Sequence, residues 1–66
     1  MKITLNGEPR ELADGATVAE LVATLEVAPE LVAVELNSEL VAKARRAETP
    51  LSEGDSVEIV TLVGGG

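Results

Sequence analysis

Several residue types that usually carry protein chemistry are missing from this sequence of 66 residues. It has no cysteine, which excludes a disulfide framework, a thiolate nucleophile and a cysteine-based zinc site. It has no histidine, so the commonest metal ligand and the usual acid/base group near neutral pH are absent. It also lacks Phe, Tyr and Trp, the side chains on which nucleic-acid bases stack. Little catalysis is therefore expected from the chain's own side chains.

What is present indicates one small, acidic, folded domain. Hydrophobic residues make up 45% of the sequence, which is too apolar for a disordered chain despite a net charge of -7. The negative charge disfavours nucleic acid and anionic membranes as partners, and it suits either solubility or a partner with a basic docking face. Because no apolar run approaches the ~18 residues of a membrane span and the start lacks a signal peptide, we expect a cytoplasmic protein.

The N-terminal part has the pattern of a β-hairpin. Apolar residues alternate over positions 1–5, which predicts a half-buried strand. Asn6 and Gly7 follow, and this pair is the strongest short signal for a hairpin turn. The return strand is expected over residues 8–12. Pro9 cannot donate to a strand ladder, so this second strand should lie at an edge of the sheet, where it would also protect a monomer from edge pairing.

A single helix is predicted over about residues 18–26. Thr17 and Glu20 have the spacing of a capping box, and Pro29 should stop the helix. One apolar stripe with helical spacing consists of Val18, Leu21, Val22 and Leu25.

The second half of the sequence predicts three further strands. A tight turn is expected at Asn37-Ser38, and Gly54 should take a positive φ in a second turn. The other predicted elements are a strand at 32–36, a short strand from Leu40-Val41, a loop with one helical turn at 42–50 and a strand at 57–63.

This order of elements is typical of the β-grasp, an α+β fold in which a mixed sheet of about five strands wraps on one helix. We expect the first and last strands to pair in parallel at the middle of the sheet, because the connection between them contains a helix. The predicted organisation is a domain at 1–62 followed by a flexible glycine tail at 63–66.

The tail is the feature that points to chemistry. Residues 63–66 would reach at most roughly 13 Å when extended, and Gly64, Gly65 and Gly66 could enter a channel too narrow for side chains. The terminal carboxylate becomes reactive once one oxygen is made a leaving group, for example by adenylation. A frayed end without function is the alternative.

Three pairs of carboxylates elsewhere in the sequence are candidates for acid/base or metal chemistry. They are interpreted as solvated surface charge with no metal site: Glu8 with Glu11, Asp14 with Glu20, and Glu53 with Asp55.

A docking surface is predicted from strand parity. Val60 and Leu62 should point away from the helix, near Ala33 and Glu35 if the two strands are adjacent. Exposed aliphatic residues beside a functional tail would suit a partner; ordinary scattered surface residues are the alternative.

The segments "MKITLNGEPRELADGATVAELV", "VAVELNSELV" and "GDSVEIVTLVGGG" together resemble the ThiS family, the ubiquitin-like sulfur carriers of thiamin biosynthesis. The resemblance implies that Gly66 is adenylated by an ATP-using enzyme and then converted to a thiocarboxylate. The sulfur would come from cysteine through a desulfurase, and thiazole synthase would accept it. Gly65 and Gly64 match the family's terminus, and together with Val63 and the parity-predicted Leu62 and Val60 they are the residues expected to contact these partners. The chain itself would be a protein co-substrate with no bound cofactor.

The sequence departs from many relatives in three places. Leu62 stands where many have an aromatic residue, Ser38 stands where many have glycine, and 42–50 is the least family-like segment. Three other functions remain open at this point: the small subunit of molybdopterin synthase, a ubiquitin-like modifier joined to lysines, and a docking domain that never uses its terminus.

Overall fold

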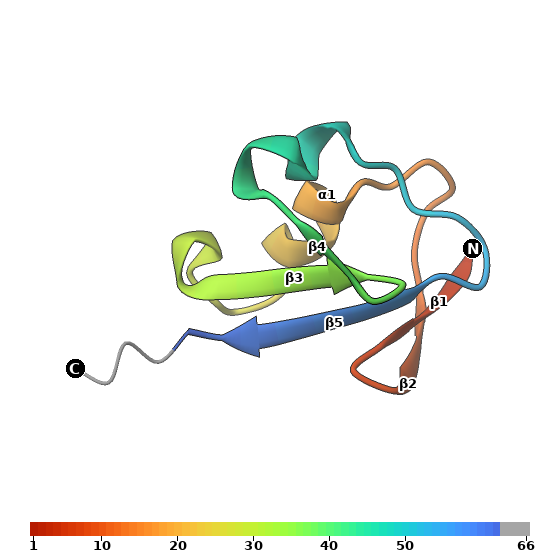
Figure 1. Cartoon of the computed structure of the whole chain (residues 1–66). Helices are drawn as coiled ribbons and strands as arrows, with labels where there is room; N and C mark the ends of the chain where they lie inside the picture. The colour runs from red at the N-terminus through yellow and green to blue at the C-terminus, as the bar shows by residue number, and fades with distance from the viewer. Residues whose placement is uncertain (63–66) are drawn as a thin grey trace.

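The computed structural model describes residues 1–62, which form a five-stranded sheet covered on one side by a single α-helix. The strands follow the order β2-β1-β5-β3-β4, with β1 parallel to β5 and the other neighbours antiparallel. This is the predicted β-grasp, and β5 lies at its centre (Figure 1). The strands are β1 (Lys2–Leu5), β2 (Glu8–Glu11), β3 (Val32–Leu36), β4 (Glu39–Val41) and β5 (Ser56–Thr61).

The first hairpin forms as predicted. Asn6 and Gly7 take φ values of 52° and 84°, the left-handed geometry that two-residue hairpin turns require. The Asn6 side chain also reaches β5, because its Oδ1 accepts a hydrogen bond of 2.8 Å from the Ile59 amide. Pro9 lies on β2, which is an edge strand as predicted.

The helix α1 (Val18–Ala23) begins where predicted and ends earlier. Thr17 and Glu20 form the predicted capping box, with hydrogen bonds of 2.9 and 3.2 Å between each side chain and the other residue's amide. The predicted end at residue 26 is wrong. The Thr24 hydroxyl donates to the Leu21 carbonyl, and the Leu25 amide bonds back only three residues to Val22. This tighter turn ends the helix before Pro29 can.

Two short 3₁₀ helices, η1 (Pro29–Leu31) and η2 (Lys43–Glu48), lie on either side of the β3–β4 hairpin in the sequence. The prediction of a loop with one helical turn at 42–50 is therefore only partly correct, because η2 is longer. The turn between β3 and β4 does lie at Asn37-Ser38, where both residues have positive φ. The last strand starts one residue earlier than predicted, at Ser56, and ends at Thr61.

The core lies between α1 and the inner face of the sheet. Its alternation agrees with the predicted strand parity, since Val57 is buried while Glu58 and Val60 are exposed. Leu51 is a buried residue that the sequence pattern did not indicate. Among residues 1–62, no helix combines the length and apolar character needed to cross a bilayer. The buried hydrophobic residues are Ile3, Leu5, Val18, Leu21, Val22, Val32, Val34, Leu51 and Val57.

Candidate functional site

The end of β5 is supported mainly by β3. β1 pairs with β5 at Ser56 and Val57 and then ends at Leu5, so the second half of β5 lies beyond β1. There β3 continues alongside, with Val32 opposite Thr61 (Figure 1). Within residues 1–62, the last main-chain contact is a hydrogen bond of 2.6 Å from the Leu62 amide to the Leu31 carbonyl. The position of Leu62, from which the chain continues to its terminus, therefore depends on the start of β3.

The outer face of the sheet carries an exposed aliphatic patch beside this end. Val60 is 57% exposed and Leu62 is 49% exposed, and Ala33 lies opposite Val60 as predicted from parity. Leu40 of β4 is 72% exposed and was not predicted to belong to this surface. Its pairing with Glu35 places it on the same face. We call Ala33, Leu40, Val60 and Leu62 the outer patch.

A shallow hollow connects the outer patch to the segment after β4. Its volume is about 200 Å³, and its lining includes Ala33, Leu40 and Leu62 together with Lys43 and Arg46. Such a hollow at the edge of an aliphatic surface can take a single apolar side chain from a partner. The sequence could have indicated Leu40, because alternation after the Asn37-Ser38 turn places it on the outer face.

Two carboxylates lie next to the outer patch and directly opposite each other. Glu35 on β3 faces Glu58 on β5, and both side chains are exposed. Like charges in this arrangement destabilise a sheet by roughly 0.2–1 kcal/mol. A basic partner would relieve that repulsion, so the negative charge beside the patch is complementary to a basic docking face.

The predicted terminal site falls beyond the region that the structure describes. Val63, Gly64, Gly65 and Gly66 all lie outside the described residues 1–62. Of the predicted partner-binding residues, the structure therefore places Val60 and Leu62 and brings both to one face, next to the end of β5.

Four of the carboxylates considered for acid/base or metal chemistry make contacts within the fold. Glu20 caps α1, while Glu53 accepts a hydrogen bond of 2.9 Å from the Lys2 amide. Asp55 accepts hydrogen bonds from Asn37 and Ser52. Asp14 lies 3.2 Å from the Met1 amine and raises the pKa of that amine above its ordinary value through hydrogen bonding. These contacts support the interpretation as surface charge.

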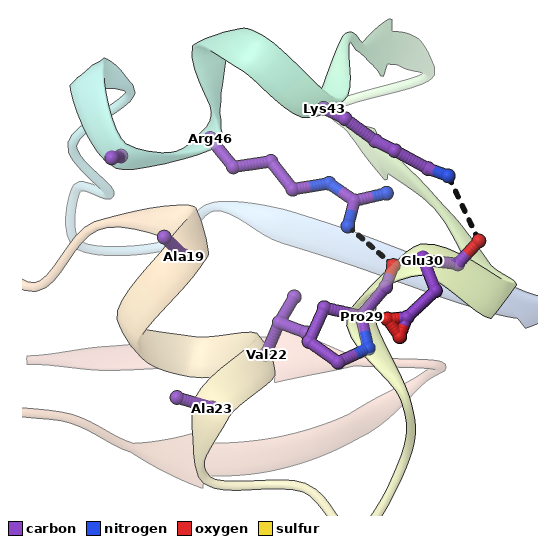
Figure 2. A pocket seen from close by; sticks show the side chains of 8 residues that line it. Ala19, Val22, Ala23, Pro29, Glu30, Lys43 and Arg46 are labelled. Carbon is purple, nitrogen blue, oxygen red and sulfur yellow. Dashed lines mark hydrogen bonds between the residues drawn. The ribbon is translucent and has the colours of Figure 1, made fainter.

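A second hollow, of about 360 Å³, lies on the opposite side of the sheet between α1, η1 and η2. Figure 2 shows Lys43 and Arg46 extending from η2 towards Pro29 and Glu30. Arg46 is only 6% exposed and is the one charged residue among residues 1–62 that is buried. The sequence did not predict this, because the 42–50 segment has no clear period and a run of basic residues usually lies in solvent.

Comparison with known proteins agrees with the fold and identifies the family. The model of the ThiS family matches residues 3–66, which is nearly the entire chain and includes all three terminal glycines. The chain belongs to the ThiS family. The family match therefore confirms the resemblance seen in the sequence.

Two relatives of similar length to this chain are named as ThiS proteins. The sulfur carrier protein ThiS of Thermus thermophilus is 42% identical over 64 residues, covering 97% of this chain and 98% of the relative. A crystal structure of a ThiS thiamine biosynthesis protein from Geobacter metallireducens superimposes with a TM-score of 0.85 at 39% identity and covers 100% of both chains. A sulfur carrier in thiamin biosynthesis is the function that these ThiS relatives and the family match together support.

Other relatives contain a segment like this chain within a longer protein. A thiazole synthase of Paramagnetospirillum magneticum is 42% identical over 66 residues, which cover 100% of this chain and 20% of that synthase. A thiazole synthase of Magnetococcus marinus is 44% identical with the same coverage. The chain thus spans about a fifth of the length of these synthases.

Proposed function

We propose that this ThiS family member carries sulfur on the carboxylate of Gly66. An ATP-dependent enzyme would adenylate that carboxylate, releasing pyrophosphate, and a sulfur nucleophile would then displace AMP to leave a thiocarboxylate. The observation that carries the proposal is that the ThiS family match extends to Gly66. Gly65 and Gly64 complete a terminus without side chains, which suits entry into a narrow channel.

In this proposal, partner enzymes perform every chemical step. This chain lacks cysteine and histidine, so no side-chain thiol of its own competes for the transferred sulfur. ATP would bind to the activating enzyme, and this chain would hold no cofactor. The sulfur would come from a cysteine desulfurase. A cytoplasmic location belongs to this proposal, because activation consumes ATP.

Thiazole synthase is the proposed acceptor of the sulfur. Support comes from the two thiazole synthases that contain a segment like this chain, since joining two proteins in one chain raises the effective concentration of one at the other. The same reasoning favours thiazole synthase over the molybdopterin synthase left open by the sequence.

The outer patch is the proposed docking surface for these partners. It combines exposed aliphatic residues with the flanking Glu35 and Glu58, and it lies beside Leu62. Val60, Leu62 and Val63 would form the part of the contact nearest the terminus. Docking of the body would offset the cost of ordering the glycines, about 1–2 kcal/mol for each residue.

An intact-mass measurement tests the proposal. The protein is incubated with ATP, the activating enzyme and a sulfur donor, and the C-terminal peptide is then analysed. We expect the mass increase that corresponds to replacing one oxygen atom by sulfur, located on Gly66. The matched control is a variant with one alanine added after Gly66, which should gain no sulfur on Gly66. An unchanged mass of the wild-type protein, with all components active, would contradict the carrier function.

A further inference from the structure

The carbonyl groups at the start of β3 are held by two basic side chains from η2. The Arg46 Nη1 atom donates to the Pro29 carbonyl at 2.9 Å, and Nη2 donates to the Val32 carbonyl at 2.7 Å. The Lys43 Nζ atom donates to the Glu30 carbonyl at 2.8 Å. Figure 2 shows the contacts to Pro29 and Glu30, with both side chains extending from η2 across to the η1 segment.

The remaining carbonyl in this segment is the one that binds the end of β5. Leu31 accepts the hydrogen bond of 2.6 Å from the Leu62 amide. Of the four consecutive carbonyls at 29–32, three are therefore held by Lys43 or Arg46, and the fourth holds Leu62. The two basic side chains and Leu62 thus act on the same short stretch of main chain.

Strand geometry explains why a side chain is needed here. Neighbouring residues of an antiparallel strand direct their main-chain groups to opposite sides. The Leu31 carbonyl points to β5, so the Val32 carbonyl points towards the side on which β4 lies. β4 has already ended at Val41, opposite Val34. The guanidinium of Arg46 supplies the hydrogen bond that the missing strand residue would have made.

Burying an arginine is energetically unfavourable if the side chain only fills space. Its Nε is buried and has no hydrogen-bond partner among the described residues. An apolar side chain of similar volume would pack without leaving such an N–H unpaired. What the arginine adds is directed hydrogen bonding to two carbonyls that are separated along the chain, which restricts the main chain between them.

We propose that Arg46, assisted by Lys43, is a positioning residue that sets the place and direction in which the chain leaves the sheet at Leu62. The inference rests on the proposed function for its consequence, which is that the terminus reaches the activating enzyme in the correct geometry. Arg46 acts through the 29–32 segment and lines both the hollow on the helix side of the sheet and the one beside the outer patch. Because it is only 6% exposed and its guanidinium is bound to main-chain carbonyls, docking through the outer patch should depend on it only weakly.

Arg46→Met is the principal test, and Arg45→Met is its matched control. Arg45 belongs to the same 3₁₀ helix, but its side chain is 72% exposed and pairs with Glu48 three residues away. In Arg46→Met we expect the Leu62 amide to exchange its hydrogen about tenfold faster or more. We also expect kcat for adenylation to fall about tenfold or more, with KM changed by less than about twofold, since small misplacements of a reacting group are costly. Arg45→Met should change none of these values.

Two further variants separate positioning from a general loss of stability. Arg46→Lys can supply one of the two contacts, so its Leu62 exchange and kcat should lie between those of wild type and Arg46→Met. Lys43→Met removes an exposed side chain and should fold normally, with a smaller change in the same direction. All values are measured well below the melting temperature of each variant, where a merely structural role would leave kcat unchanged.

The outcomes distinguish this inference from the proposed function. If wild type is never adenylated while Leu62 exchange accelerates in Arg46→Met and Lys43→Met, the carrier function fails and the positioning of Leu62 stands. If the folded variants exchange Leu62 at the wild-type rate, the positioning role is overturned. Accelerated exchange together with reduced kcat and recovery in Arg46→Lys would support both.

Discussion

The two faces of the sheet use the same aliphatic residue types for different purposes. On the inner face Val57 is 0% exposed and belongs to the core cluster that includes residues of α1, while three residues later on the same strand Val60 is 57% exposed. The inner residues hold the domain together. The outer patch lies beside the end of β5 and contributes little to the core, which leaves it available for a partner. Whether a hydrophobic strand residue contributes to stability or to docking can therefore be decided only when the face of the sheet on which it lies is known.

The largest expected effect on stability comes from truncating a valine on the inner face, and the same truncation on the outer face is its comparison. Val57→Ala should lower the free energy of unfolding by about 2 kcal/mol, because it removes two buried methyl groups and leaves a cavity. Val60→Ala should change it by less than about 0.5 kcal/mol. Chemical denaturation of the two variants measures both values. Equal losses would show that Val60 belongs to the core and would remove the distinction between the faces.

A charge on the outer patch should break docking while leaving the fold intact. We expect Leu62→Asp to weaken binding to the activating enzyme or to thiazole synthase by about tenfold or more, as for an interface residue that contributes strongly. Titration calorimetry measures the affinity, and circular dichroism checks the fold. Val27→Asp is the control, because Val27 is also an exposed hydrophobic residue but lies in the loop after α1. Unchanged affinity in Leu62→Asp would show that the patch is not the docking surface.

The turn between β3 and β4 determines which side chains of β4 reach the outer face. Ser38 has a φ of 74°, a conformation that is strained for residues other than glycine, Asn and Asp. Ser38→Gly should therefore raise the free energy of unfolding by roughly 0.5–1 kcal/mol. Asn37→Gly should lower it, because the Asn37 side chain bonds Asp55 and the Ser56 amide. Thermal melts of both variants would show opposite shifts; shifts in the same direction would contradict this account of the turn.

The smallest expected effect concerns the two carboxylates beside the patch. Glu58→Gln removes one of two opposed charges and should stabilise the domain by a few tenths of a kcal/mol at low salt, with less gain at high salt. Glu8→Gln is the control, since Glu8 is an exposed strand residue opposite Leu5. The same Glu58 variant should bind a basic partner more slowly. A gain that does not depend on salt would show that charge repulsion is not the cause.

Most of the fold could be predicted because its signals are local. The Asn6-Gly7 turn, the capping box of Thr17 and Glu20 and the alternation along β5 are each set by residues close together in the sequence. The helix end was missed because Thr24 competes for a main-chain carbonyl, a local effect that the apolar stripe conceals.

Some features of the candidate site could likewise be predicted from local sequence, and others could not. The glycines of the terminus and the outward direction of Val60 and Leu62 could be read from the sequence and from parity. Leu40 joined the patch only through the pairing of β4 with β3, and the buried position of Arg46 was not predicted at all.

By itself, the sequence determined the order of the elements, both hairpin turns and the residues that one face of each strand presents, because these depend on φ preferences and on a period of two. The tertiary structure alone decided that Arg46 is buried and that it shares a segment of main chain with Leu62. The contact arises because β4 is too short to pair with Val32, so a carbonyl at the end of the sheet needs a donor from elsewhere. No local pattern in 42–50 predicts this contact, because the unpaired carbonyl exists only once β3 and β4 have come together in the folded chain.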